Sequence, residues 1–119
     1  MDWFEAPYFL ARVRLTGQTA DVADTTITGT AGTYRVTVYL VDTAADITAG
    51  AVTAHIKFND GAAAQDVPVG PVALITLGAM AQATIAADLG SGNLTYGSTH
   101  TGLFGTAAYR LVVITEVLG

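Results

Sequence analysis

A strict alternation of side-chain type in the stretch TYRVTVYLVD constrains the fold of this chain more than any other feature. Tyr34, Val36, Val38 and Leu40 alternate with a more polar set that begins at Arg35. Successive side chains of a strand point to opposite faces of a sheet, so this period of two, rich in β-branched residues, predicts a half-buried strand. The pattern recurs in AVTAHIKFND (51–60) and in AAYRLVVITEVL (107–118), where both faces are apolar, as in a central strand.

Weaker strand patterns fill most of the remaining chain. They cover residues 11–19, 24–28, 71–77, 80–87 and 92–98, and most breaks between them contain Gly or Asp, which favour turns. About eight short strands without a clear helix predict an all-β fold, an antiparallel β-sandwich of the jelly-roll type. The competing interpretation is a helix over LGAMAQATIAADLG (77–90), which its alanine content would support.

The composition indicates a single domain that buries part of its surface against other subunits. The chain has 119 residues, 51% of them hydrophobic and 13% charged, which excludes a disordered, solvated chain. With so few charges, a small monomer would expose apolar patches, so we expect an oligomer. We expect residues 10–119 to form the domain and residues 1–9 to form an aromatic N-terminal arm.

The charge distribution argues against nucleic-acid and membrane partners. The net charge is −5, and the basic residues are spaced along the chain, at Arg12, Arg14, Arg35, Lys57 and Arg110. Binding to phosphate needs a basic face, and the sequence shows no basic run. We also see no signal-peptide pattern and no apolar stretch long enough to span a membrane, so a soluble chain is expected.

Candidate catalytic and metal-binding residues do not form a recognisable set. His55 and His100 are far apart in sequence, and Ser91 and Ser98, the only serines, lie outside a nucleophile motif. The pairs Asp21/Asp24 and Asp42/Asp46 lack the dense oxygen-ligand spacing of a calcium loop. The chain has no cysteine, which excludes disulfides and thiolate sites. We predict no enzymatic activity, no metal and no cofactor.

Two long segments resemble a small β domain of tailed-bacteriophage virion proteins. They are TGTAGTYRVTVYLVDTAA (28–45) and GNLTYGSTHTGLFGTAAYRLVVITEVL (92–118), and QTADVADTTI (18–27) resembles the lead-in. The layout is similar to the tumour-necrosis-factor-like jelly roll, which is usually trimeric. The resemblance implies a homotrimeric virion structural protein on the surface of the particle, made in the host cytoplasm. Its type would be a capsid decoration (cement) protein or a head fibre, in contact with the capsid or another virion protein.

A trimeric jelly roll buries strand faces both within the sandwich and around its threefold axis. We therefore expect Tyr39, Val41, Tyr109 and Val112 to be divided between these two buried surfaces, and we assign them as candidate subunit-interface residues.

The first nine residues contain Trp3, Phe4, Tyr8 and Phe9, four of the chain's ten aromatic residues. Such side chains bury about 150–250 Å² each when packed, so something is expected to cover them. One interpretation is that the segment lies across its own sandwich or a neighbouring subunit. The other is that it docks on a virion partner, with Trp3 and Phe4 as anchors and Asp2 and Glu5 as a polar rim.

An alternative function is a carbohydrate- or receptor-binding module of a phage tail or fibre, since such sandwiches carry ligand sites in their loops. In the loop STHTGLF (98–104), Phe104 would stack on a sugar and His100 would form a hydrogen bond to it.

Overall fold

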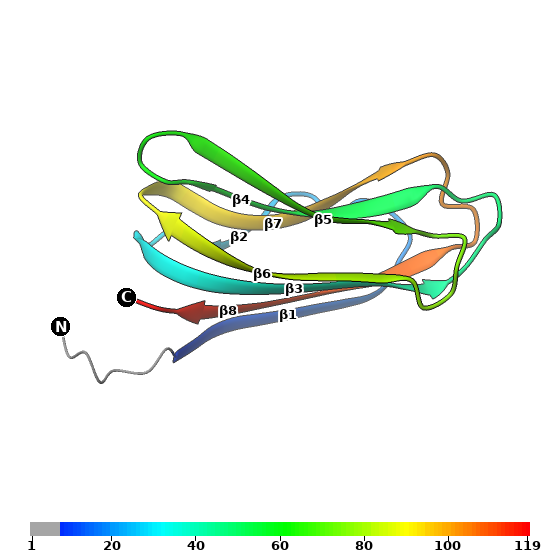
Figure 1. Ribbon diagram of the computed structural model, residues 1–119, viewed down its shortest axis with the longest axis horizontal. Coiled ribbons are helices and arrows are strands. Elements are labelled where there is room, and N and C mark those ends of the chain that lie inside the picture. Colours follow the sequence, from blue (N-terminus) through cyan, green and yellow to red (C-terminus); the bar gives the residue numbers. More distant parts are fainter. Residues whose placement is uncertain (1–7) are drawn as a thin grey trace.

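The computed structural model describes residues 8–119, which form eight strands in two antiparallel four-stranded sheets (Figure 1). The strands are β1 (Tyr8–Gln18), β2 (Thr25–Thr28), β3 (Gly32–Ala44), β4 (Ala51–Asn59), β5 (Ala64–Ala73), β6 (Met80–Leu89), β7 (Ser91–Thr101) and β8 (Ala108–Val117). Sheet A has the order β1-β8-β3-β6, and sheet B has the order β2-β7-β4-β5. The expectation of an all-β antiparallel sandwich is confirmed.

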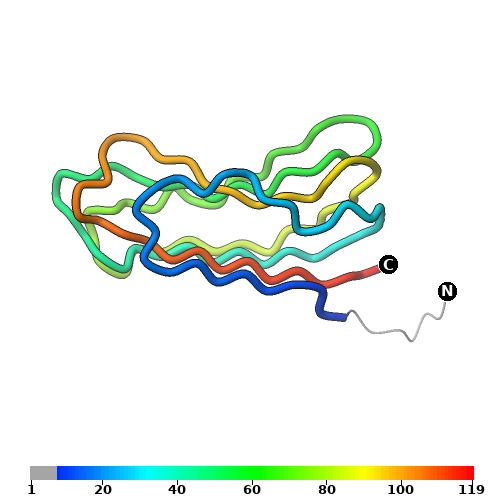
Figure 2. The backbone as a smooth tube through the Cα atoms, turned by 180° about the vertical axis from the view of Figure 1, so that it is seen from behind, coloured from blue at the N-terminus to red at the C-terminus, as the bar shows by residue number. Residues whose placement is uncertain are grey.

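The chain passes from one sheet to the other at every connection except the β4–β5 hairpin. Figure 2 shows this at the start of the sandwich, where β1 in sheet A is followed by β2 in sheet B and the chain then returns to β3 in sheet A. Eight strands connected in this way in two sheets form the jelly-roll arrangement.

The core lies between the two sheets and follows the predicted alternation. From sheet A, Val36, Val38 and Leu40 of β3 and Leu111 and Val113 of β8 are buried. From sheet B, the buried side chains include Val52, Ile56, Val69 and Leu94. Because β3 pairs with both β8 and β6, it is a central strand with its even-numbered residues from Tyr34 to Leu40 directed inward.

The strand predicted at 80–87 is confirmed, the competing helix interpretation is wrong, and the strand predicted at 71–77 is misplaced. The segment with high alanine content is strand β6, because its alternate residues Ile85, Ala87 and Leu89 enter the core, so the helix interpretation fails. The strand expected at 71–77 is instead β5, Ala64–Ala73. Strand β5 contains Pro68 and Pro71, and it lies at the edge of sheet B, where a missing N–H is tolerated.

The N-terminal boundary of the sandwich differs from the expected one. Tyr8 and Phe9, which we assigned to the arm, are the first residues of β1, and they pair with Val117 and Glu116 of β8. Trp3 and Phe4 lie outside the described residues.

Truncation of a core side chain tests this packing. Leu40 is fully buried, so Leu40→Ala is expected to lower the free energy of unfolding by about 2–5 kcal/mol in urea titrations. Leu77→Ala removes the same atoms from a side chain that is 69% exposed and is expected to change it by less than about 0.5 kcal/mol. Equal effects of the two substitutions would contradict the assigned core.

Candidate functional site

The outer face of sheet A carries four of the five basic residues of the chain. Arg12 and Arg14 of β1 lie opposite Ile114 and Val112 of β8. On the other side of β8, Ile114 and Val112 pair with Thr37 and Tyr39 of β3, while Arg110 pairs with Val41 and Glu116 with Arg35. Directly paired residues share one face of a sheet. We call this surface the arginine face, defined by Arg12, Arg14, Arg35, Arg110, Tyr39, Val112 and Ile114.

The expectation that the basic residues are scattered is therefore wrong in three dimensions. The four arginines occupy outward positions of β1, β3 and β8, three adjacent strands of sheet A. In β3 and β8, the alternation places Arg35 and Arg110 on the face of the sheet that points away from the core. What the sequence could not supply was the order of the strands, which brings those two positions next to Arg12 and Arg14.

One of these arginines has an acidic partner on the same face. Arg35 donates from Nε to Oε1 and from Nη2 to Oε2 of Glu116, both at 3.0 Å. These hydrogen bonds lower the pKa of Glu116 and raise the pKa of Arg35. Within residues 8–119, no ion pair involves Arg12, Arg14 or Arg110, so the arginine face has an excess of positive charge.

The structure divides the four predicted subunit-interface residues between two surfaces. Tyr39 and Val112 are half-buried on the arginine face, where they pair with each other. Val41 lies on the same side of sheet A, but it is already buried within the chain, with 8% of its surface exposed. Tyr109 is completely buried between the sheets and is corrected to a core residue. Its position in β8 has the opposite parity to Val112, which is why the two side chains point in opposite directions.

Tyr109 instead ties the two sheets together through its hydroxyl group. The hydroxyl oxygen lies 2.6 Å from Ser98 Oγ of β7, and it donates to the carbonyl oxygen of Ala20 at 2.7 Å. Ser98 Oγ also accepts from the backbone N–H of Val22 at 2.8 Å. Burial raises the pKa of Tyr109, so the neutral, hydrogen-bonding form is favoured.

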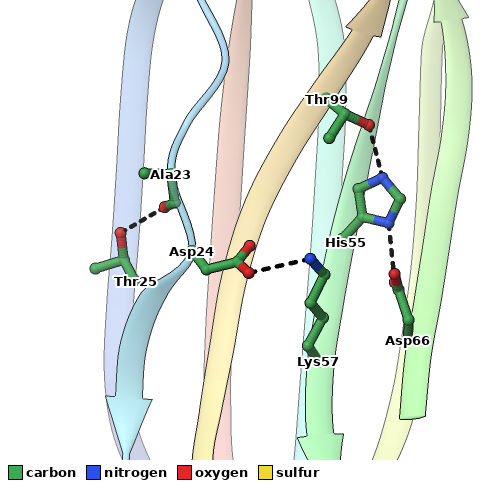
Figure 3. A network of polar contacts seen from close by, with 7 residues as sticks. All are labelled: Ala23, Asp24, Thr25, His55, Lys57, Asp66 and Thr99. Atoms are coloured by element: carbon green, nitrogen blue, oxygen red, sulfur yellow. Dashed lines mark hydrogen bonds and ion pairs between the residues drawn. The ribbon is translucent and has the colours of Figure 1, made fainter. Parts of the chain in front are cut away.

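The outer face of sheet B has the opposite character, because its charged groups are paired with each other (Figure 3). His55 contacts Asp66 Oδ1 through Nδ1 at 2.9 Å and Thr99 Oγ1 through Nε2 at 2.8 Å. Lys57 Nζ donates to Asp24 Oδ2 at 3.0 Å, which raises the pKa of Lys57. These contacts join β5, β4 and β7 and the start of β2 into one polar network.

A second candidate contact surface lies at one end of the sandwich, where three loops meet. The β3–β4 loop exposes Ile47 (89%), the β5–β6 loop exposes Leu77 (69%) and Ile75 (49%), and the β7–β8 loop exposes Leu103 (68%). Backbone hydrogen bonds from Asp46 to Leu74 and from Gly50 to Leu103 hold the three loops together. We call Ile47, Ile75, Leu77 and Leu103 the apolar tip. Exposed apolar groups gathered in this way are typical of interaction sites.

Asp46 organises the loops that carry the apolar tip. Its Oδ1 accepts from the backbone N–H and the hydroxyl of Thr48, and its Oδ2 accepts from the N–H of Thr106 at 2.8 Å and its hydroxyl at 3.1 Å. These hydrogen bonds, first of all that from Thr106 N–H, hold the pKa of Asp46 far below its usual range. The β3–β4 loop is thereby fastened to the β7–β8 loop.

The two residues considered for a glycan contact are brought together. The rings of His100 and Phe104 have centroids 4.5 Å apart, and His100 Nδ1 lies 2.6 Å from Asp21 Oδ1. Phe104 is half-buried against the core and stacks on Tyr109, with centroids 6.0 Å apart. One face of the Phe104 ring is therefore used inside the protein, although the glycan contact itself stays a prediction.

The two arm residues that the structure describes are exposed. The side chains of Tyr8 and Phe9 are 55% and 60% exposed, and Leu10 and Leu118 add exposed apolar surface at the same end of sheet A. This end lies opposite the apolar tip, because β1 and β3 run in the same direction from it to the loops.

The described residues show neither a metal cluster nor a membrane-spanning helix. In the range 8–119, no group of three or more His, Asp or Glu side chains is arranged to hold a metal ion. No helix in this range is long and apolar enough to cross a membrane. The predicted lack of catalytic activity and of a cofactor stays a prediction.

Comparisons with known proteins return little. No family model matches the chain, and no curated protein is significantly similar to it. Among solved structures, a pentameric capsid protein from metagenomic phage sequences aligns at 14% identity with a TM-score of 0.45, over 91% of this chain and 68% of that chain.

The role of Asp46 predicts a pH dependence of stability. Because its pKa is lowered in the folded chain, its stabilisation is present above the ordinary aspartate pKa and is lost progressively as pH falls below about 5. Asp46→Asn is expected to lower the urea midpoint at pH 7 and to make the fall of the midpoint in acid shallower.

The matched control is Asp88→Asn, because Asp88 is an exposed residue of β6 to which no residue in the range 8–119 donates a side-chain hydrogen bond. This variant is expected to leave the urea midpoint at pH 7 nearly unchanged. If Asp46→Asn has the urea midpoints of the wild type across the pH range, Asp46 does not fasten the loops.

Proposed function

We propose that this chain is a non-enzymatic structural protein of a bacteriophage virion, a homotrimeric capsid decoration or head-fibre component that acts by surface contact. The observation that carries the proposal is the apolar tip, where three hydrogen-bonded loops present large aliphatic side chains to solvent. Water is an unfavourable environment for such a surface, and a partner that covers it gains the free energy of apolar burial.

The resemblance to phage virion domains supports the same role. Its two strand motifs fall in β3 and β8, which pair along almost their whole length at the centre of sheet A. These motif residues build the sheet and its inward face, so they favour a structural protein over an enzyme.

We assign the two contact surfaces to different partners. The arginine face, with Tyr39 and Val112 at its centre, is the subunit contact of the homotrimer. The apolar tip contacts the capsid or another virion protein. The protein is made in the host cytoplasm and is located on the surface of the assembled particle. The loops hold their shape without a partner through Asp46, which favours a preformed docking surface.

The alternative role, a glycan- or receptor-binding module, has weaker support. His100 and Phe104 are neighbours, but His100 is engaged by Asp21 and the ring of Phe104 packs on Tyr109. A sugar platform needs an exposed aromatic face.

Immunogold labelling of purified phage particles tests the proposed role. An antibody raised against the recombinant chain is expected to label the head surface of particles from the phage that encodes it. Labelling confined to tails or fibres would favour the alternative role. Particles without label, and without peptides of this chain in mass spectra, would contradict a virion protein; antibody against a host cytoplasmic protein serves as the control.

A further inference from the structure

The arginine face is charged opposite to the chain as a whole. The net charge of the chain is −5, yet the outer face of sheet A gathers four arginines against two carboxylates, Glu116, which is already paired with Arg35, and the exposed Asp88 on the edge strand β6. Like charges concentrated on one face repel each other, so a partner with negative charge stabilises it.

Apolar side chains lie between the arginines on this face. Ile114 and Val112 occupy the middle of the face, flanked by Arg12 and Arg14 on one side and by Tyr39 on the other. All three apolar side chains are half-buried by their neighbours alone. A fitting partner therefore combines carboxylates with large apolar side chains in an extended segment.

The first seven residues of the chain, MDWFEAP, have this composition. Asp2 and Glu5 carry the two charges, and Trp3 and Phe4 lie between them. Arginine pairs with carboxylates and also stacks on aromatic rings, so each side-chain type of the segment has a complement on the face. Seven extended residues span at most about 25 Å, enough to cover the rows of the face from Glu116 to Arg110.

The position of Tyr8 favours a second copy of the chain over the same copy. Tyr8 begins β1 opposite Val117, at the end of sheet A, and β1 runs from there along the sheet. A segment that continues this direction leaves its own sheet, whereas return to its own arginine face requires a reversal of the chain.

We propose that residues 1–7 of one copy bind the arginine face of a second copy, with Asp2 and Glu5 paired with arginines and with Trp3 and Phe4 on Val112 and Ile114. This inference rests on the proposed self-association and adds to it the segment that joins the subunits.

Trp3 provides a direct readout, because it is the only tryptophan of the chain. In the full-length wild-type protein, Trp3 emission is expected to be protected from acrylamide quenching. The variant Arg12→Glu/Arg14→Glu, with a reversed face, and the variant Asp2→Lys/Glu5→Lys, with a reversed segment, are each expected to lose this protection. The control Thr53→Glu/Thr101→Glu places carboxylates on the outer face of sheet B and is expected to retain it.

Mixing the two reversed variants distinguishes copies. The acidic segment of one variant then meets the unchanged arginine face of the other, and the lysine segment meets the glutamate face, so protection of Trp3 is expected to return. If each variant alone loses protection and mixing does not restore it, the segment binds its own copy and the proposal is overturned. Protection that is unaffected by either reversal overturns it as well.

Light-scattering mass measured on the same samples separates this inference from the proposed function. If the wild type is a trimer and its Trp3 is fully quenched by acrylamide, the proposed trimer is supported and the segment contact is overturned. A wild-type monomer overturns the trimer and, with it, the segment contact. If Trp3 is fully quenched and single-stranded DNA binds the wild type but not Arg12→Glu/Arg14→Glu, the face is a nucleic-acid site and the proposal fails.

Discussion

The antiparallel pairing of β3 with β8 is the constraint on which the rest of the structure depends. From Tyr34 opposite Val117 to Asp42 opposite Tyr109, this register is continuous, and both strands alternate without a break. One set of side chains therefore enters the core, while the other set forms the centre of the arginine face. A slip of one residue would exchange the two sets of side chains in the strand that moves, and would bury Arg35 if β3 moved or Arg110 if β8 moved.

This register also explains which parts of the molecule were predictable from sequence. The strands around Val36, Ile56 and Leu111 were predicted because periodicity is a local property that sequence records directly. Strand β5 was misplaced because its prolines are acceptable only at a sheet edge, and whether a strand lies at an edge depends on the fold of the whole chain.

The candidate surfaces were less predictable than the strands, for a related reason. Parity along β8 separates Tyr109 from Val112, but it does not say which set faces the core until the partner strands are known. The arginine face arises from strand order, since Arg12 and Arg110 are distant in sequence. The apolar tip likewise requires three loops to meet, and Asp46, which joins two of them, stood out in the sequence only as a weak calcium candidate.

The outer faces of the two sheets differ in their charged groups, and this difference favours sheet A over sheet B as the contact between subunits. Sheet B satisfies its charged groups internally through His55, Lys57 and their acidic partners. On sheet A, half-buried apolar side chains face outward beside Arg12, Arg14 and Arg110, which have no ion-pair partner in the range 8–119. A partner that covers this face gains apolar burial and is favoured if it also supplies carboxylates to those arginines. In this account the sandwich associates through sheet A and presents its loop end to a larger partner.

The most direct test of this account is the light-scattering mass of the full-length chain carrying Val112→Asp, compared with the wild type and with Thr53→Asp on sheet B. We predict three times the chain mass of 12.2 kDa for the wild type and for Thr53→Asp, and a folded monomer for Val112→Asp. A Val112→Asp protein that remains folded with an unchanged mass would contradict sheet A as the contact.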